Sequence, residues 1–165
     1  MSKATLTKKI FAGADKLLKK AIKKELKEQG HKNTGQLERS IISTIKIESG
    51  EAVLEGTSLY YAKFINDGVK ADSISFKQFP FIVAYFKSKG FDEKLSKQYA
   101  GATIKKWMKE GMPASGSMRF SKNGRRLNFM GYVEQETEAK LEATVQEGLD
   151  NLINEVYLKA KSETI

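Results

Sequence analysis

Two long segments, one toward each end of the chain, have apolar side chains at the spacing of an amphipathic helix. The first is residues 5–29 and the second is residues 132–160. In both, an apolar residue recurs every three or four positions, which is the period of one helix face. Gly30 directly follows the first segment, where a glycine commonly ends a helix. The sequence therefore predicts long helices at both ends of the fold.

The charges of these two segments are opposite in sign. Residues 1–33 carry ten Lys against three acidic residues, whereas residues 131–165 carry three Lys against eight acidic residues. The whole chain has a net charge of +9, which favours polyanions as neighbours. The acidic last segment offers a partner for the basic first segment, either within the chain or in a neighbouring copy.

A β-hairpin is predicted over residues 37–57. Turn chemistry at Thr34-Gly35 precedes it, and mostly apolar positions then alternate with polar ones along the first strand. Ser49-Gly50 predicts a tight reversal into the return strand. We expect a small antiparallel sheet that helices cover on one face. The side chains expected to face those helices are Ile41, Ile45 and Val53.

The middle of the chain is predicted to be helical. A short helix or tight loop is expected over residues 60–66, closed by Gly68. Pro80 suits the first turn of a helix that ends before Gly90, and a buried strand is the alternative for this apolar run. A further helix is predicted over 93–110. Its inward side chains are expected to be Leu95, Tyr99, Ala102, Ile104, Trp107 and Met108.

These elements predict one α+β domain over residues 1–165. In it a small antiparallel β-sheet packs against long N- and C-terminal helices, and a central helical pair over 78–110 completes the fold. The chain is long enough to bury a core without covalent cross-links. It contains no cysteine, so no disulfide framework and no thiol chemistry are expected.

The sequence lacks the residues of the common catalytic sites. It has no Cys and a single histidine, His31, so a typical zinc site and a Ser-His-Asp arrangement are not expected. The glycine-rich stretch 111–117 lacks the Lys of a phosphate loop. The longest apolar run, residues 79–86, is far shorter than the roughly 20 residues of a membrane helix. We therefore expect no enzyme, no cofactor, no metal site and no membrane association.

A basic loop is predicted over residues 112–130. Its cationic side chains surround Phe120, and arginines interleaved with aromatic residues can hold phosphates and bases or anchor a protein interface. An interface or lumen-lining loop is favoured over a sequence-specific nucleic-acid reader, because no reading motif is present. The loop is expected to contribute little to the fold. The candidates for assembly or DNA-channel contact are Arg119, Lys122, Arg125 and Arg126.

The order of the segments resembles a known family. Residues 34–41 resemble the "TGxLxxSI" segment of the tail-completion and head–tail joining proteins, minor tail components of long-tailed bacteriophages. Residues 61–68 resemble the "YAxFVExG" segment of that family, and the predicted helices before Gly90 and Gly111 are similar to its central helices. The residues that carry the first two segments are Thr34, Gly35, Leu37, Ser40, Ile41, Tyr61, Ala62 and Gly68.

The resemblance implies a structural virion protein without catalytic residues. It implies a homo-oligomeric ring, expected to be sixfold, at the phage neck or tail end, joining the head connector to the tail tube around the DNA channel. The implied partners are the adjacent head-connector and tail-tube proteins, with non-specific contact to packaged DNA, after assembly in the host cytoplasm. The alternative is a small basic DNA-binding or architectural protein, which the net charge favours and the acidic last segment disfavours.

Overall fold

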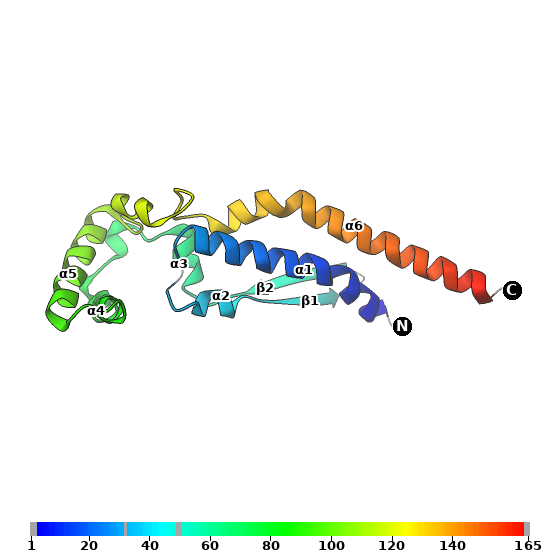
Figure 1. The fold of residues 1–165 in the computed structure, drawn as a ribbon, viewed down its shortest axis with the longest axis horizontal. Coiled ribbons are helices and arrows are strands. Elements are labelled where there is room, and N and C mark those ends of the chain that lie inside the picture. The colour runs from blue at the N-terminus through cyan, green and yellow to red at the C-terminus, as the bar shows by residue number, and fades with distance from the viewer. Residues whose placement is uncertain (1–2, 32, 49–50, 164–165) are drawn as a thin grey trace. The chain divides into compact units, whose positions relative to one another are not determined.

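The computed structural model describes residues 3–31, 33–48 and 51–163. The chain divides into two compact units, one made of residues 1–62 and 129–165, and one made of residues 63–128. We call them the terminal unit and the central unit, and each is described by itself. The elements are mostly helices, with one small antiparallel sheet and a long helix at each end (Figure 1). The predicted α+β class is therefore confirmed.

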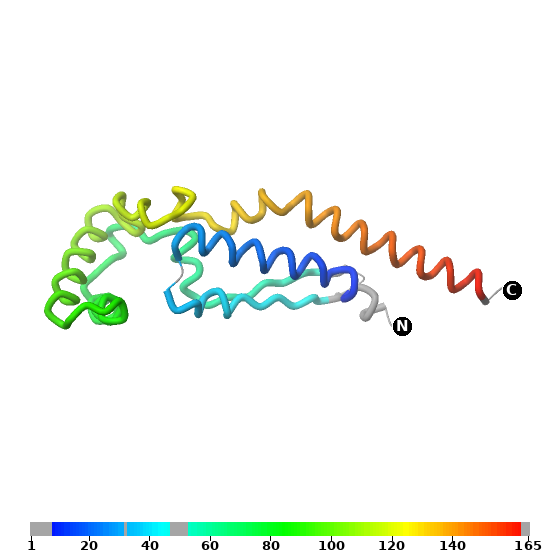
Figure 2. The backbone as a smooth tube through the Cα atoms, in the orientation of Figure 1, coloured from blue at the N-terminus to red at the C-terminus, as the bar shows by residue number. Residues whose placement is uncertain are grey.

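The terminal unit is built on two long helices, α1 (Lys3–Glu28) and α6 (Phe129–Glu163). They run side by side in opposite directions (Figures 1 and 2). The N–H of His31 donates to the carbonyl of Leu26 at 2.9 Å and that of Gly30 donates to Lys27 at 3.1 Å. With Gly30 at φ 73°, this is the Schellman ending that the sequence suggested. Predicted helices at both ends are thus confirmed.

The basic first helix and the acidic last helix pair within the chain. Lys24 Nζ lies 3.1 Å from Glu136 Oε1, and Lys9 Nζ lies 3.4 Å from Glu155 Oε2. Of the two partners that the sequence left open for the lysines of α1, the structure shows the one in the same chain. The opposite charges therefore give no argument of their own for contact between copies.

A two-stranded antiparallel hairpin packs on α1, so that α1 lies between the hairpin and α6 (Figure 1). Its strands are β1 (Ile42–Glu48) and β2 (Glu51–Thr57). The structure corrects the predicted start of the hairpin, because Gln36–Ser40 forms a short helix, α2. Gly35, at φ 73° and ψ 7°, precedes that helix in the left-handed region. The predicted reversal at Ser49-Gly50 lies outside the described residues.

The register of the hairpin corrects one predicted inward residue. Ile45 pairs with Leu54, so these two side chains share a face, and both are partly buried. Val53 pairs with Lys46 on the other face and is 52% exposed. Ile41 caps the end of α2 and is partly buried. Leu54, not Val53, therefore accompanies Ile45 on the more buried face.

The central unit is a helical pair with short connecting turns. Its main elements are α4 (Phe79–Ser88) and α5 (Glu93–Glu110), so a helix and not the alternative strand occupies the Pro80 run. Asp92 accepts a hydrogen bond from the Leu95 N–H at 2.8 Å, which caps α5. The shorter elements are α3 (Ala62–Asp67), which begins at the unit boundary, and three 3₁₀ helices, Ala71–Ser73, Phe76–Gln78 and Ser115–Phe120.

The buried face of α5 differs from the predicted one. Ser96, Ala100 and Ile104 are fully buried, and the small residues at the first two positions let α4 approach closely. Ile104 was predicted to point inward and does so, and Trp107 is partly buried. The remaining predicted inward side chains are exposed, namely Leu95, Tyr99, Ala102 and Met108.

Candidate assembly surface

The first family-like segment forms a local turn whose residues hold structure. Thr34 is exposed, and its Oγ1 accepts a hydrogen bond from the Gln36 N–H at 3.3 Å. Gly35 is buried, and Leu37 is buried at 5% exposure. The Ser40 hydroxyl donates to the Leu37 carbonyl at 2.8 Å. These residues build α2 and its junction with β1.

The second segment begins next to the first. The Leu59 N–H donates to Ser40 Oγ at 3.2 Å, and the Ala62 N–H donates to the Leu59 carbonyl at 2.9 Å. Ala62 is 2% exposed, whereas the side chains of Tyr60 and Tyr61 are exposed. The two segments, about twenty residues apart in the sequence, are therefore joined at Ser40 in the terminal unit.

Gly68, the last residue of the second segment, has a separate role in the central unit. At φ 79°, a Cβ there would lie 2.6 Å from the Met112 carbonyl oxygen. The next residue, Val69, exchanges two backbone hydrogen bonds with Met112, each of 2.8 Å. At Gly111, with φ 86°, a Cβ would lie 2.9 Å from the Val69 carbonyl oxygen. Glycine is needed at both positions because the two backbone segments touch there.

The four basic candidates divide into an exposed pair and a half-buried pair. Arg119 and Lys122 are exposed, and the Arg119 guanidinium lies 4.8 Å from the centre of the Phe120 ring. Arg125 and Arg126 are half-buried, and burial lowers the pKa of Arg126, partly offset by the nearby Tyr85. A contact role for the four residues stays a prediction.

The basic loop is more structured than the sequence suggested. A 3₁₀ helix occupies Ser115–Phe120, and α6 already begins at Phe129. Glu110, at the end of α5, accepts hydrogen bonds from both the N–H and the hydroxyl of Ser115, at 3.0 and 2.8 Å. These hydrogen bonds from Ser115 lower the pKa of Glu110. The predicted minor contribution of residues 112–130 to the fold is wrong, because the loop is tied to α5 and buries Ala114.

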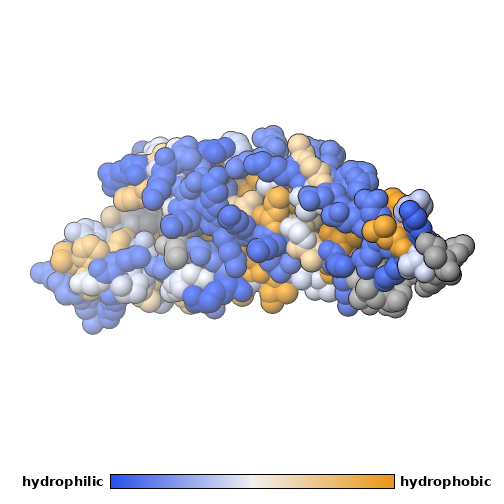
Figure 3. Space-filling view, turned by 45° about the vertical axis from the view of Figure 1, so that its right-hand side comes forward, coloured by the Kyte–Doolittle hydropathy of each residue, from blue (hydrophilic) through white to orange (hydrophobic). Residues whose placement is uncertain are grey.

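An exposed apolar stripe on the last turns of α6 was missed by the sequence reasoning. Its side chains are Leu149, Ile153, Val156 and Tyr157, which are 40%, 64%, 56% and 64% exposed. Length is the signal that could have revealed it: α6 has 35 residues and α1 has 26, so α1 cannot cover all of α6. Figure 3 shows that apolar side chains interrupt an otherwise mostly hydrophilic surface.

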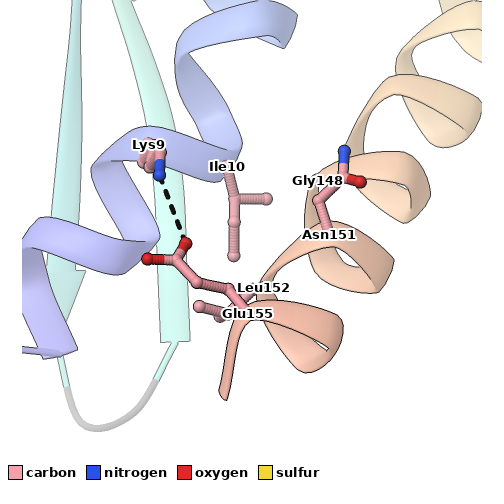
Figure 4. A pocket seen from close by; sticks show the side chains of 6 residues that line it. All are labelled: Lys9, Ile10, Gly148, Asn151, Leu152 and Glu155. Atoms are coloured by element: carbon pink, nitrogen blue, oxygen red, sulfur yellow. Dashed lines mark hydrogen bonds and ion pairs between the residues drawn. The ribbon is translucent and has the colours of Figure 1, made fainter. Parts of the chain in front are cut away.

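A small hollow lies between α1 and α6 (Figure 4). Its volume is about 210 Å³, below the roughly 300–1,000 Å³ of ligand pockets. The Lys9–Glu155 ion pair spans it, and the hydrogen bond from Lys9 lowers the pKa of Glu155. We interpret the hollow as a packing gap. The residues that line it are Lys9, Ile10, Gly148, Asn151, Leu152 and Glu155.

Polar chemistry and comparison add no competing site. Over the described residues, no three His, Asp or Glu side chains gather to hold a metal ion, and no helix is long and apolar enough to cross a membrane. Comparison with known families, with curated proteins and with solved structures finds no match for this chain. The candidate functional features are therefore surfaces: the stripe on α6 and the basic exterior of the central unit.

Proposed function

We propose that this protein is a structural virion subunit of a tailed phage. It forms a ring at the neck or tail end and joins the head connector to the tail tube around the DNA channel. The ring and the joining role come from the resemblance of the two short segments and from the order of the elements. In this chain those segments hold a turn, a helix end and a backbone bridge, which are structural roles.

The observation that carries the proposal is the apolar stripe on α6. Leu149, Ile153, Val156 and Ala160 follow one another at intervals of four, three and four residues. This is the spacing of a coiled-coil seam, whose side chains gain stability when a second helix covers them. Such a seam on the chain's longest helix favours a second copy as its partner, because most soluble oligomers are made of identical subunits.

A single charge placed on the stripe tests this contact. Val156→Glu should dissociate the oligomer, because the carboxylate would be desolvated between two apolar surfaces. Leu158→Glu is the matched control, since Leu158 is 63% exposed and lies about half a turn around the helix from Val156. Light scattering should show a smaller particle for Val156→Glu and an unchanged one for Leu158→Glu. A parent chain that is monomeric at all concentrations would contradict the seam.

The joining role is tested in the virus itself. Removing the gene from a phage that encodes this chain should leave filled heads and separate tails in electron micrographs of the lysate. Supplying the parent chain in trans should restore joined particles. Normal particles without the protein would refute the proposed function.

The alternative, a free-standing DNA-binding protein, is favoured by the net charge of +9. It predicts a monomer or dimer that is absent from purified virions. Electron microscopy of virions labelled with an antibody against the chain separates the two functions, because only a virion subunit is found at the neck or tail end.

A further inference from the structure

The entire net positive charge of the chain lies in the central unit. Residues 63–128 carry fourteen Lys and Arg against five Asp and Glu, which is a net charge of +9. The remaining residues carry fifteen of each sign and are neutral as a group. In the terminal unit, ion pairs such as Lys24–Glu136 set acidic side chains of α6 beside lysines of α1. The electrostatic attraction for a polyanion is therefore concentrated on the central unit.

One face of α5 collects lysines that have no acidic partner among the described residues. Lys94, Lys105 and Lys109 are exposed and form no ion pair there. Eleven residues separate the first two and four separate the last two, so all three fall within about one sixth of the helix circumference. They lie opposite the buried face. Lys97 and Lys106, in contrast, pair with acids of the same helix, at 2.6 and 3.9 Å.

We propose that this lysine face of α5, defined by Lys94, Lys105 and Lys109, binds the backbone of duplex DNA without reading its sequence. The three positions extend about 22 Å along the helix axis. Duplex DNA carries roughly one charge per 1.7 Å of its axis, so a rod of phosphates meets all three ammonium groups. Flexible lysines act as point charges and leave the base edges unread.

A duplex fits this unit better than a single strand does. Single-strand binding relies on aromatic faces that are free to stack on bases. The aromatic rings beside α5 contact one another instead: Phe86, Phe91 and Tyr99 lie with ring centres 5.1 to 6.0 Å apart. The Phe120 ring is covered on one side by the Arg119 guanidinium. The inference concerns the central unit and does not depend on the proposed ring.

Two triple variants with the same charge change test the assignment. Lys94→Gln/Lys105→Gln/Lys109→Gln removes the lysine face, and glutamine keeps the helix propensity. The control, Lys16→Gln/Lys20→Gln/Lys23→Gln, removes three lysines of α1 that form no ion pair among the described residues. Binding of the full chain to a random-sequence duplex is followed by fluorescence anisotropy at several salt concentrations. Circular dichroism confirms that both variants keep the parent's helix content.

The lysine-face variant should bind roughly 10- to 100-fold more weakly at low salt. Its slope of log affinity against log salt should fall by up to about 2.7, or about 0.9 for each phosphate that a lysine no longer neutralises. The control should bind within about twofold of the parent. Equal weakening by both variants, tighter binding to single-stranded than to duplex DNA, or no binding by the parent would each overturn the inference. A chain that assembles but does not bind DNA loses this inference alone.

Discussion

Gly13 and Gly148 show how missing side chains set the distance between α1 and α6. A Cβ at Gly13 would lie 2.8 Å from Thr144 Cγ2, and one at Gly148 would lie 3.0 Å from Ile10 Cγ2 and 3.3 Å from Ile10 Cα. A glycine inside a helix costs about 1 kcal/mol relative to alanine. Close packing of the two helices explains why Gly148 is tolerated in the middle of α6.

Replacing Gly148 by alanine should lower the free energy of unfolding by about 1 kcal/mol. The gain in helix propensity, about 1 kcal/mol, is outweighed by overpacking against Ile10, which typically costs about 1–3 kcal/mol. Urea unfolding measures the difference. In an Ile10→Ala background, which removes Cγ2, the same substitution should be neutral or stabilising. A stabilised Gly148→Ala in the parent background would mean that the helices separate freely at this point.

Asp15 links α1 to the hairpin through a charge-dependent hydrogen bond. The Ser43 hydroxyl of β1 donates to its carboxylate, and Lys19 Nζ lies 3.0 Å from the other oxygen. Burial of Asp15 opposes its ionisation, but the hydrogen bonds from Ser43 and Lys19 together hold its pKa below the ordinary 3.8. A lowered folded-state pKa gives stability that is present above pH 3.8 and is lost as the pH falls through the folded value.

Ser43→Ala should therefore destabilise the protein by about 1 kcal/mol at neutral pH. The difference from the parent should shrink below pH 3.8, where Asp15 becomes protonated in both proteins. Thr44→Ala, on the exposed face of the same strand, is the control and should be neutral within about 0.5 kcal/mol. Chemical unfolding at a series of pH values provides the measurement. A constant difference down to strongly acid pH would show that ionised Asp15 is not the acceptor.

At the scale of the elements, the hairpin illustrates how register decides which residues matter. A strand's side chains alternate between faces, so a one-residue error exchanges the buried and exposed sets. The pairing of Ile45 with Leu54 places Leu54 on the face that is partly buried, whereas Val53 points to the exposed face. Adjacent residues of β2 should therefore respond in opposite ways to the same substitution.

Leu54→Asp should destabilise the terminal unit by about 2 kcal/mol or more, because it places a charge on the face next to α1. Val53→Asp should change stability by only about 0.5 kcal/mol, since that side chain is 52% exposed. Thermal unfolding of the two soluble variants gives the comparison. Similar stability losses, or a greater loss for Val53→Asp, would show that the register is different.

At the scale of the whole molecule, the central unit has its own closure. The Asn128 N–H donates to the Asn66 carbonyl at 2.7 Å, so the segments that begin and end the unit are joined to each other. The Val69–Met112 bridge links the same region to the end of α5. A small core of its own includes Ile74, Ala100, Ile104 and Ala114. A chain segment closed on itself in this way has the anatomy of an independently folding domain.

A fragment of residues 63–128 should fold by itself. Its stability should be modest, about 3–5 kcal/mol at most, because so short a chain buries little surface. Circular dichroism should show helix content that is lost cooperatively on heating. Ile104→Asp, which puts a charge in the fully buried position of α5, is the control that should abolish folding. A parent fragment without helix signal at low temperature would mean that its structure depends on the rest of the chain.

Local signals in the sequence determined the helices of this protein. The period of the apolar residues, the proline at the start of α4 and the glycines after α1, α4 and α5 act within a few neighbouring residues, so they could be read without the fold. The turn chemistry at Gly35 was equally visible. The short helix α2 after this turn was not, because alternating residues over 36–40 suit one helical turn as well as a strand.

Long-range packing decided the rest. The phase of Val53, the buried face of α5 and the half-burial of Arg125 and Arg126 depend on partners far along the chain, which no local period encodes. The pairing of Lys24 with Glu136 was one of two possibilities that charge alone could not separate. The exposed stripe on α6 and the lysine face of α5 emerged only when the buried faces were known, because a free surface is what packing leaves uncovered.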